Sequence, residues 1–265
     1  MSKIFEALQK VELEKAGPQP ESSGLPGEVD IVGDLSEKLV ALSRPGSVAA
    51  EQFRFLRSKI VRPAKGKPPK TILITSSLQG EGKTFAACNL AVTIAQGLDE
   101  HVLLVDADLR DPRVHSYFGH ERTECGLATH LQRNEPLSGL LRKTSINKLT
   151  ILPAGQETEN PSELLSSQKM HSFISEVRDR YPDRVTIFDS PPISLAPESM
   201  VIANEVDAIF FVILWSKTPR DTAKSNLEHF KRDKVKGVIF NHDPRITTAR
   251  SYSYGYGYGD IKKAQ

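Results

Sequence analysis

The residues with the clearest chemical purpose lie between positions 71 and 89, in the sequence TILITSSLQGEGKTFAACN. Gly80 and Gly82 allow the backbone to adopt positive φ and to bring its N–H groups close to an anion. Lys83 is placed to reach the β- and γ-phosphates of a nucleotide, and the Thr84 hydroxyl to bind Mg²⁺. The helix expected to begin at Lys83 adds partial positive charge at the same point. Together these features predict a P-loop.

This stretch departs from the strict P-loop pattern at one position, where Ser77 stands in place of the first glycine. A glycine-rich turn from strand to helix that binds no ligand is therefore an alternative. The order of apolar strand, small-residue loop, Gly-Lys-Thr and helix favours phosphate binding.

Three carboxylates follow two other apolar runs. Asp106 and Asp108 come after 102–105, and Asp189 comes after 185–188. In a doubly wound α/β sheet, ligands bind at the carboxyl ends of the strands, so these side chains are expected beside the P-loop. There they could hold Mg²⁺ and orient a nucleophile. Each could instead cap the next helix, although that explanation must then apply to all three. Arg110 could contact phosphate or pair with a nearby aspartate.

The elements that must position these groups predict an α/β P-loop NTPase fold, a mostly parallel twisted sheet flanked by helices. The run 207–215, DAIFFVILW, is continuously apolar, as is typical of a parallel strand covered on both faces. The segment 39–42 could pair at the sheet edge or pack on the sheet. Strands are predicted at 71–75, 102–105, 149–153, 185–188, 207–215 and 235–241. Helices are predicted at 48–60, 83–96, 125–131, 160–165, 169–181, 197–205 and 218–231.

The three motifs resemble the Walker A, Walker A′ and Walker B set of bacterial tyrosine kinases. These are the cytoplasmic autokinases of capsule and exopolysaccharide synthesis (CpsD/CapB/Wzc type), which share the deviant Walker architecture of MinD/ParA-like ATPases. The resemblance extends from about Leu39 to the C-terminus. The chain has no His-Arg-Asp loop and no Asp-Phe-Gly, consistent with a family unrelated to eukaryotic protein kinases.

The resemblance implies an ATP- and Mg²⁺-dependent protein-tyrosine autokinase. Its implied catalytic residues are Lys83, Asp106, Asp108 and Asp189, and its implied metal ligands are Thr84, Asp106 and Asp189. Its implied nucleotide-binding residues are Gly80, Glu81, Gly82, Lys83, Thr84, Phe85 and Asn241. Asn241 could meet the adenine edge or form a turn before Asp243-Pro244. The division of roles between Asp106 and Asp108, base or magnesium support, stays open.

Four tyrosines near the C-terminus alternate with serine and glycine: Tyr252, Tyr254, Tyr256 and Tyr258. The alternation could indicate a strand, but so many serines and glycines bury nothing and argue against one. We expect a mobile tail that displays phenols, with a low-complexity stacking or aggregation-prone segment as the alternative. In the family that the chain resembles, such a cluster is the autophosphorylation substrate. At roughly 3.3 Å per residue, an extended tail could reach a neighbour's active site.

A charged stripe, Glu51, Arg54 and Arg57, is predicted on the helix before the P-loop strand. An intrahelical ion pair, worth a few tenths of a kcal/mol, would account for its spacing. The resemblance implies instead an oligomerisation motif that packs against the nucleotide-site face of the next subunit in a ring.

The chain divides into four expected parts. Residues 1–16 read as an amphipathic helix, which could pack on its own domain or dock on a membrane partner. Residues 17–38 are a predicted flexible linker, 39–248 the kinase domain, and 249–265 the mobile tail.

Composition excludes several other classes. The formal net charge of +2 is too small to indicate the strongly basic surface of a nucleic-acid-binding protein, and the two cysteines form no Cys-x-x-Cys pair. No apolar run approaches bilayer length, so we expect a cytoplasmic protein without a membrane span. The resemblance implies recruitment to the inner face of the cell membrane by a separate chain-length or activator protein, and a partner tyrosine phosphatase.

Two other functions compete with the kinase. A MinD/ParA-like ATPase switch for positioning or partitioning would usually carry a second lysine early in the P-loop, where this chain has Ser77-Leu78-Gln79-Gly80. A nucleotide-binding scaffold without catalysis would not need the intact lysine and aspartates. The tyrosine-rich tail favours the kinase.

Overall fold

A computed structural model describes residues 34–179 and 183–244. Within them the chain forms a seven-stranded sheet with the strand order β3-β4-β2-β5-β1-β6-β7. Every pairing is parallel except that of β3 with β4 at one edge. The strands are β1 (Thr71–Ser76), β2 (His101–Asp106), β3 (Arg142–Lys143), β4 (Leu149–Leu152), β5 (Arg184–Asp189), β6 (Ala208–Leu214) and β7 (Val235–Asn241).

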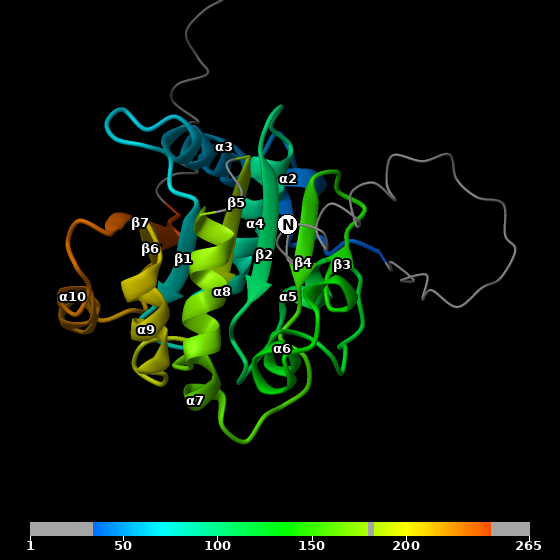
Figure 1. Cartoon of the computed structure of the whole chain (residues 1–265). Helices are drawn as coiled ribbons and strands as arrows, with labels where there is room; N and C mark the ends of the chain where they lie inside the picture. Colours follow the sequence, from blue (N-terminus) through cyan, green and yellow to red (C-terminus); the bar gives the residue numbers. More distant parts are fainter. Residues whose placement is uncertain (1–33, 180–182, 245–265) are drawn as a thin grey trace, which may run out of the picture.

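Helices cover both faces of the sheet, as Figure 1 shows. One apolar core lies between the sheet and α2 (Val40–Ser43), α3 (Val48–Val61), α4 (Lys83–Ala95) and α5 (Val114–Tyr117). The other core lies under α6 (Leu127–Arg133), α7 (Pro161–Leu165), α8 (Gln168–Asp179), α9 (Glu198–Glu205) and α10 (Arg220–Glu228). A single 3₁₀ turn, η1 (Leu137–Gly139), precedes β3.

Strand β1, in the interior of the sheet between β5 and β6, is buried along its whole length. Ile72 and Ile74 point into one core, and Leu73 points into the other, because successive side chains of a strand alternate between faces. Both faces of this strand therefore need apolar residues, which explains the unbroken apolar runs of the sequence.

Helix α4 is buried on nearly all sides, since eleven of its thirteen residues are buried. Its small residues allow close packing on the sheet and on α3. Asn89 adds polar links, because its amide donates to the carbonyl of Lys38 (2.9 Å) and accepts from the N–H of Ala41 (3.2 Å). Helix α4, which follows the predicted P-loop, is therefore fixed both by the sheet and by the segment 38–41.

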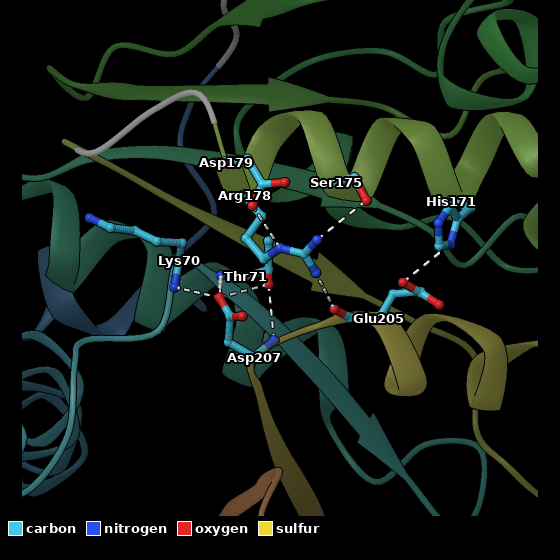
Figure 2. Close-up of polar contacts among 8 residues, drawn as sticks. All are labelled: Lys70, Thr71, His171, Ser175, Arg178, Asp179, Glu205 and Asp207. Atoms are coloured by element: carbon cyan, nitrogen blue, oxygen red, sulfur yellow. Dashed lines mark hydrogen bonds and ion pairs between the residues drawn. The ribbon is translucent and has the colours of Figure 1, made fainter.

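The amino end of the sheet carries a polar network that Figure 2 shows. Asp207, just before β6, accepts hydrogen bonds through one carboxylate oxygen from the N–H of Lys70 (2.9 Å), the N–H of Thr71 (3.0 Å) and the Thr71 hydroxyl (3.0 Å). Nearby, Arg178 of α8 donates to the carbonyl of Glu205 in α9 (3.0 Å). The starts of β1 and β6 are thus joined at the end of the sheet opposite the P-loop.

Each predicted strand and each helix predicted within the domain has a counterpart, with bounds that differ by a few residues, most of all in α10 (Arg220–Glu228), which is shorter than the predicted 218–231. Of the two alternatives for 39–42, pairing at the sheet edge is wrong. The segment forms α2 and its N-cap Leu39, and the side chains of Leu39 and Ala41 are buried in the core. The edge strand β3, the short helix α5 and η1 were not predicted. The expected N-terminal helix, most of the linker and the tyrosine-rich tail lie outside the described residues.

Candidate active site

The P-loop joins β1 to α4 at the carboxyl end of the sheet. Gly80 and Gly82 have φ of 79° and 93°, a region that glycine enters without a steric penalty. Gly82 is the N-cap of α4, so the first turn of the helix directs its N–H groups toward the loop. Lys83, the first residue of α4, is only 6% exposed. The local structure fits an anion site of the expected kind.

Asp106 and Asp189 stand side by side at this end, as the last residues of the adjacent strands β2 and β5. Both are fully buried. Asp106 accepts hydrogen bonds from the N–H of Asp108 (3.3 Å) and the N–H of Val114 (3.0 Å). Neither carboxylate oxygen of Asp189 has a partner in full hydrogen-bond geometry among the described residues. A buried carboxylate in this position is suited to a cation that completes its coordination.

Burial dominates the electrostatics of the three aspartates. It raises the pKa of Asp106, and the charge of Asp189 raises it further. It also raises the pKa of Asp189 and of Asp108, in both cases against the opposing charge of Lys83. The Thr84 hydroxyl lowers the pKa of Asp189 as well, so it lies close to that carboxylate. Lys83 alone does not compensate this much buried negative charge.

No group of three or more histidine, cysteine, aspartate or glutamate side chains in residues 34–179 and 183–244 could hold a metal ion on its own. Magnesium commonly takes one or two carboxylates and completes its shell with phosphate oxygens and water. The Asp189 carboxylate with the Thr84 hydroxyl fits that kind of partial site.

Arg110 is paired with a carboxylate, but with a glutamate rather than an aspartate. Its guanidinium forms an ion pair with Glu198 of α9 (2.9 Å) and donates to the Ser162 hydroxyl of α7 (3.0 Å). The Glu198 side chain is completely buried, whereas that of Arg110 is 43% exposed. Arg110 therefore joins two helices at the rim of the site.

Asn241 does not present a free amide. Its Nδ2 donates to the carbonyl of Glu81 (3.0 Å), and its Oδ1 accepts from the N–H of His242 (3.0 Å). The side chain therefore holds the P-loop in this structure, and contact with adenine stays a prediction. Phe85 follows Thr84 in the first turn of α4 and forms an edge-to-face ring pair with Phe53 of α3 at 5.8 Å.

The predicted oligomerisation stripe lies on α3. Glu51 and Arg54 form an intrahelical ion pair in which both side chains are 41% exposed. Arg54 also donates to the carbonyl of Pro45 (2.8 Å). Part of the spacing of this stripe is thus explained within one chain, and a role between subunits stays a prediction.

Two residues beside the site were not identified from the sequence. Glu198 and Thr218 contact Arg110 and Glu81, respectively, across long stretches of chain. A single glutamate after Pro197 and a single threonine after a strand are too common to carry a signal.

In the described part of the chain, no helix combines the length and apolar character needed to cross a bilayer.

A phosphate loop between β1 and α4, at the carboxyl end of a parallel sheet and beside two acidic strand ends, defines a P-loop NTPase. The family model described as "AAA domain" matches residues 69–210. Tyrosine-protein kinase YwqD of Bacillus subtilis is 34% identical over 209 residues, which cover 78% of this chain and 86% of YwqD. The crystal structure of the chimerical protein CapA2B2 superposes with a TM-score of 0.70 at 28% identity, covering 89% of this chain and 99% of that one.

The chain therefore belongs to the family of bacterial tyrosine-protein kinases. Some relatives are much longer. Tyrosine-protein kinase ptk of Acinetobacter johnsonii is 30% identical over 205 residues, which cover 77% of this chain but only 27% of ptk. The chain thus matches about a quarter of that relative's length.

Proposed function

We propose that this chain is an ATP-dependent protein-tyrosine autokinase. It transfers the γ-phosphoryl group of Mg·ATP to tyrosines of the C-terminal tail of a neighbouring subunit. The observation that carries the proposal is the buried Asp189 carboxylate, which has no full hydrogen-bond partner among the described residues and lies beside Thr84 and Lys83. The family membership supports the same reaction.

The proposed roles follow from position. Lys83 and the backbone N–H groups from Gly80 to Thr84 bind the phosphates. Thr84 and Asp189 hold the magnesium ion, which neutralises charge on the phosphates when bound, and Asp106 supports it from the adjacent strand.

Proton transfer needs a carboxylate that the tyrosine can reach. Asp106 is fully buried and accepts two backbone hydrogen bonds. Asp108 is 6% exposed, accepts a backbone hydrogen bond from the N–H of Asp111 (3.1 Å), and is close to Lys83. These contrasts favour Asp108 as the group that accepts the phenol proton. The tyrosine oxygen forms the new bond to phosphorus, and the bond to the bridging oxygen of ADP breaks with its electron pair.

The proposal also covers the setting of the reaction. The kinase acts in a ring of its own copies, regulates capsule or exopolysaccharide synthesis and export, and is reversed by a tyrosine phosphatase. A separate membrane chain-length protein recruits it to the inner face of the membrane and activates it.

Intact-mass spectrometry after incubation with Mg·ATP tests the reaction. The matched control is a variant in which the four tail tyrosines, Tyr252, Tyr254, Tyr256 and Tyr258, are replaced by phenylalanine. We expect phosphate additions in the wild type that disappear in the control. ATP hydrolysis without any addition, also in the presence of the activator's cytoplasmic segment, would contradict the kinase and favour an ATPase switch.

A further inference from the structure

Glu81 lies in the middle of the P-loop, yet its side chain does not face solvent. It is 2% exposed. One carboxylate oxygen accepts the N–H of Leu78 (2.7 Å), and the other accepts the hydroxyl of Thr218. The carbonyl of Glu81 accepts the amide of Asn241 (3.0 Å). A single loop residue thus receives hydrogen bonds from the loop itself, from the β6–α10 connection and from the end of β7.

The two distant partners of Glu81 are themselves connected. The Thr218 hydroxyl accepts the N–H of Leu214, the last residue of β6 (3.0 Å). The N–H of Trp215 donates to the carbonyl of Asn241 (2.9 Å). The ends of β6 and β7, which are neighbours in the sheet, therefore contact the P-loop as one connected unit (Figure 1).

Asn241 also lies directly against the loop backbone. A Cβ atom added to Gly82 would be only 2.1 Å from Nδ2 of Asn241. Together with the φ of 93° at this position, the contact requires glycine. The amide therefore limits the freedom of the one residue at which the loop becomes helix α4.

We propose that Glu81, Thr218 and Asn241 form a P-loop lock, a set of positioning residues that holds the loop in its phosphate-binding shape before nucleotide arrives. The inference rests on the proposed function, which makes the ligand of the loop a nucleotide. A loop with two glycines has many open conformations, and ordering them at the moment of binding would weaken affinity. A loop ordered in advance avoids that cost.

The lock predicts a specific kinetic pattern. Thr218→Val keeps the side chain's shape but removes the donor to Glu81. We expect about a tenfold weaker affinity for the fluorescent nucleotide mant-ADP with Mg²⁺. KM for ATP should rise in parallel, whereas kcat should change by less than about threefold, since the loop is correctly shaped once nucleotide is bound. Thr218→Ser keeps the donor and should restore both values.

A second variant tests the carboxylate. In Glu81→Gln, the amide oxygen can accept the N–H of Leu78 while the amide nitrogen donates to Thr218, so we expect a smaller loss of nucleotide affinity than in Glu81→Ala. Glu81→Ala removes both contacts and should weaken binding at least as much as Thr218→Val. Equal losses in the Gln and Ala variants would contradict a lock made of hydrogen bonds.

Hydrogen exchange measures the lock without nucleotide. Peptides covering 77–83 should exchange faster in nucleotide-free Thr218→Val than in the wild type. Asn241→Asp, which removes the donor to Glu81, should have the same effect. Because no nucleotide is present, a role of Asn241 in adenine binding cannot affect this comparison. This variant also tests the lock independently should Thr218→Val fold poorly.

The matched control is Thr144→Val. The Thr144 hydroxyl likewise donates a hydrogen bond, to the carbonyl of Leu149 (2.9 Å), but this buried residue lies at the β3–β4 edge. Both variants should unfold at lower temperature, and only Thr218→Val should lose nucleotide affinity. Equal stability losses with unchanged mant-ADP binding and unchanged exchange at 77–83 would overturn the lock. A wild type that binds no nucleotide would instead overturn the proposed function, and the exchange result would still decide the lock.

Discussion

Asp106 and Asp189 face each other in register on adjacent parallel strands, and neither side chain reaches solvent. Two like charges this deep repel each other, and water does not screen them. Asp106 is compensated by two backbone N–H groups, whereas Asp189 has only the nearby Lys83 and Thr84. The folded protein without metal therefore carries an electrostatic strain at the place where magnesium is proposed to bind.

The first prediction concerns the pH dependence of stability without metal. Burial raises the pKa of Asp189 from 3.8 to about 7. The folded state then binds a proton that the unfolded state releases, so the free energy of unfolding falls as pH rises from about 4 to about 7. We expect a slope of about 1.4 kcal/mol per pH unit from this group, measured by urea unfolding in the presence of a chelator.

Asp189→Asn is the control for that slope. It should lower the slope by about 1.4 kcal/mol per pH unit, while Asp106 and Asp108, whose pKa values burial also raises, keep their contributions. It should also stabilise the metal-free protein at about pH 8 by roughly 1–2 kcal/mol, because one buried charge is gone. The same variant should lose phosphorylation. A wild-type slope that Asp189→Asn leaves unchanged would contradict this assignment.

The second prediction concerns Lys83. Lys83→Met keeps an unbranched side chain of similar length but removes the cation that faces the phosphates and two aspartates. We expect autophosphorylation to fall by about a hundredfold or more, while circular dichroism still reports a folded protein. The control is Lys67→Met, at an exposed position before β1, which should phosphorylate like the wild type. Normal phosphotyrosine in Lys83→Met would exclude the proposed mechanism.

The third prediction concerns assembly. Within the chain, Arg54 forms a partly exposed ion pair with Glu51 on the same helix and donates to the carbonyl of Pro45. Such an exposed intrahelical pair contributes a few tenths of a kcal/mol. Changing Arg54 and Arg57 to alanine should therefore leave the monomer stable and abolish the oligomer. Light scattering that finds the same particle mass in the variant would refute an oligomerisation role.

The fourth prediction concerns the ion pair at the rim. Arg110→Met leaves the completely buried Glu198 without its cation. Because Arg110 itself is partly exposed, we expect a loss of about 2–3 kcal/mol, somewhat below that for a fully buried pair. Combining it with Glu198→Gln should recover most of the loss in a double-mutant cycle by urea unfolding. Additive losses would show that the two side chains do not depend on each other.

The fifth prediction concerns the opposite end of the sheet. Asp207→Ala removes three hydrogen bonds that hold the starts of β1 and β6 together. We expect roughly 2–4 kcal/mol lower stability by urea unfolding, because two backbone N–H groups lose a charged acceptor. Nucleotide affinity should not change, since the network lies away from the P-loop. A large rise in Kd for mant-ADP would instead reveal coupling along β1.

Local patterns were sufficient for every strand of the sheet except β3, and for the acidic strand ends. Residues 72–74 and 208–214 are apolar throughout because both faces of β1 and most of β6 are covered. The carboxyl ends of parallel strands share one edge, so the order of apolar runs and aspartates is enough to predict Asp106 and Asp189 near the P-loop. The fold class follows from the same reasoning.

The remaining features depend on contacts that no local pattern contains. The segment 39–42 is too short for its period to separate helix from strand, and only packing against α4 decides it. Thr218 is 137 residues from Glu81, and Asn241 is 160 residues from it. Hydrogen bonds over such separations depend on the folded topology, so no short sequence spacing predicts them.

The position of Asn241 affects how phosphorylation would respond to dilution. Strand β7 ends at this residue beside the P-loop, and the described chain continues only to Pro244. Every tail tyrosine is therefore tethered to a point next to a nucleotide loop. In a ring, the phenols of one subunit have a high effective concentration at the next subunit's site. Phosphorylation would then be first order in assembled protein and insensitive to dilution, until dilution separates the subunits and the kinetic order rises to two.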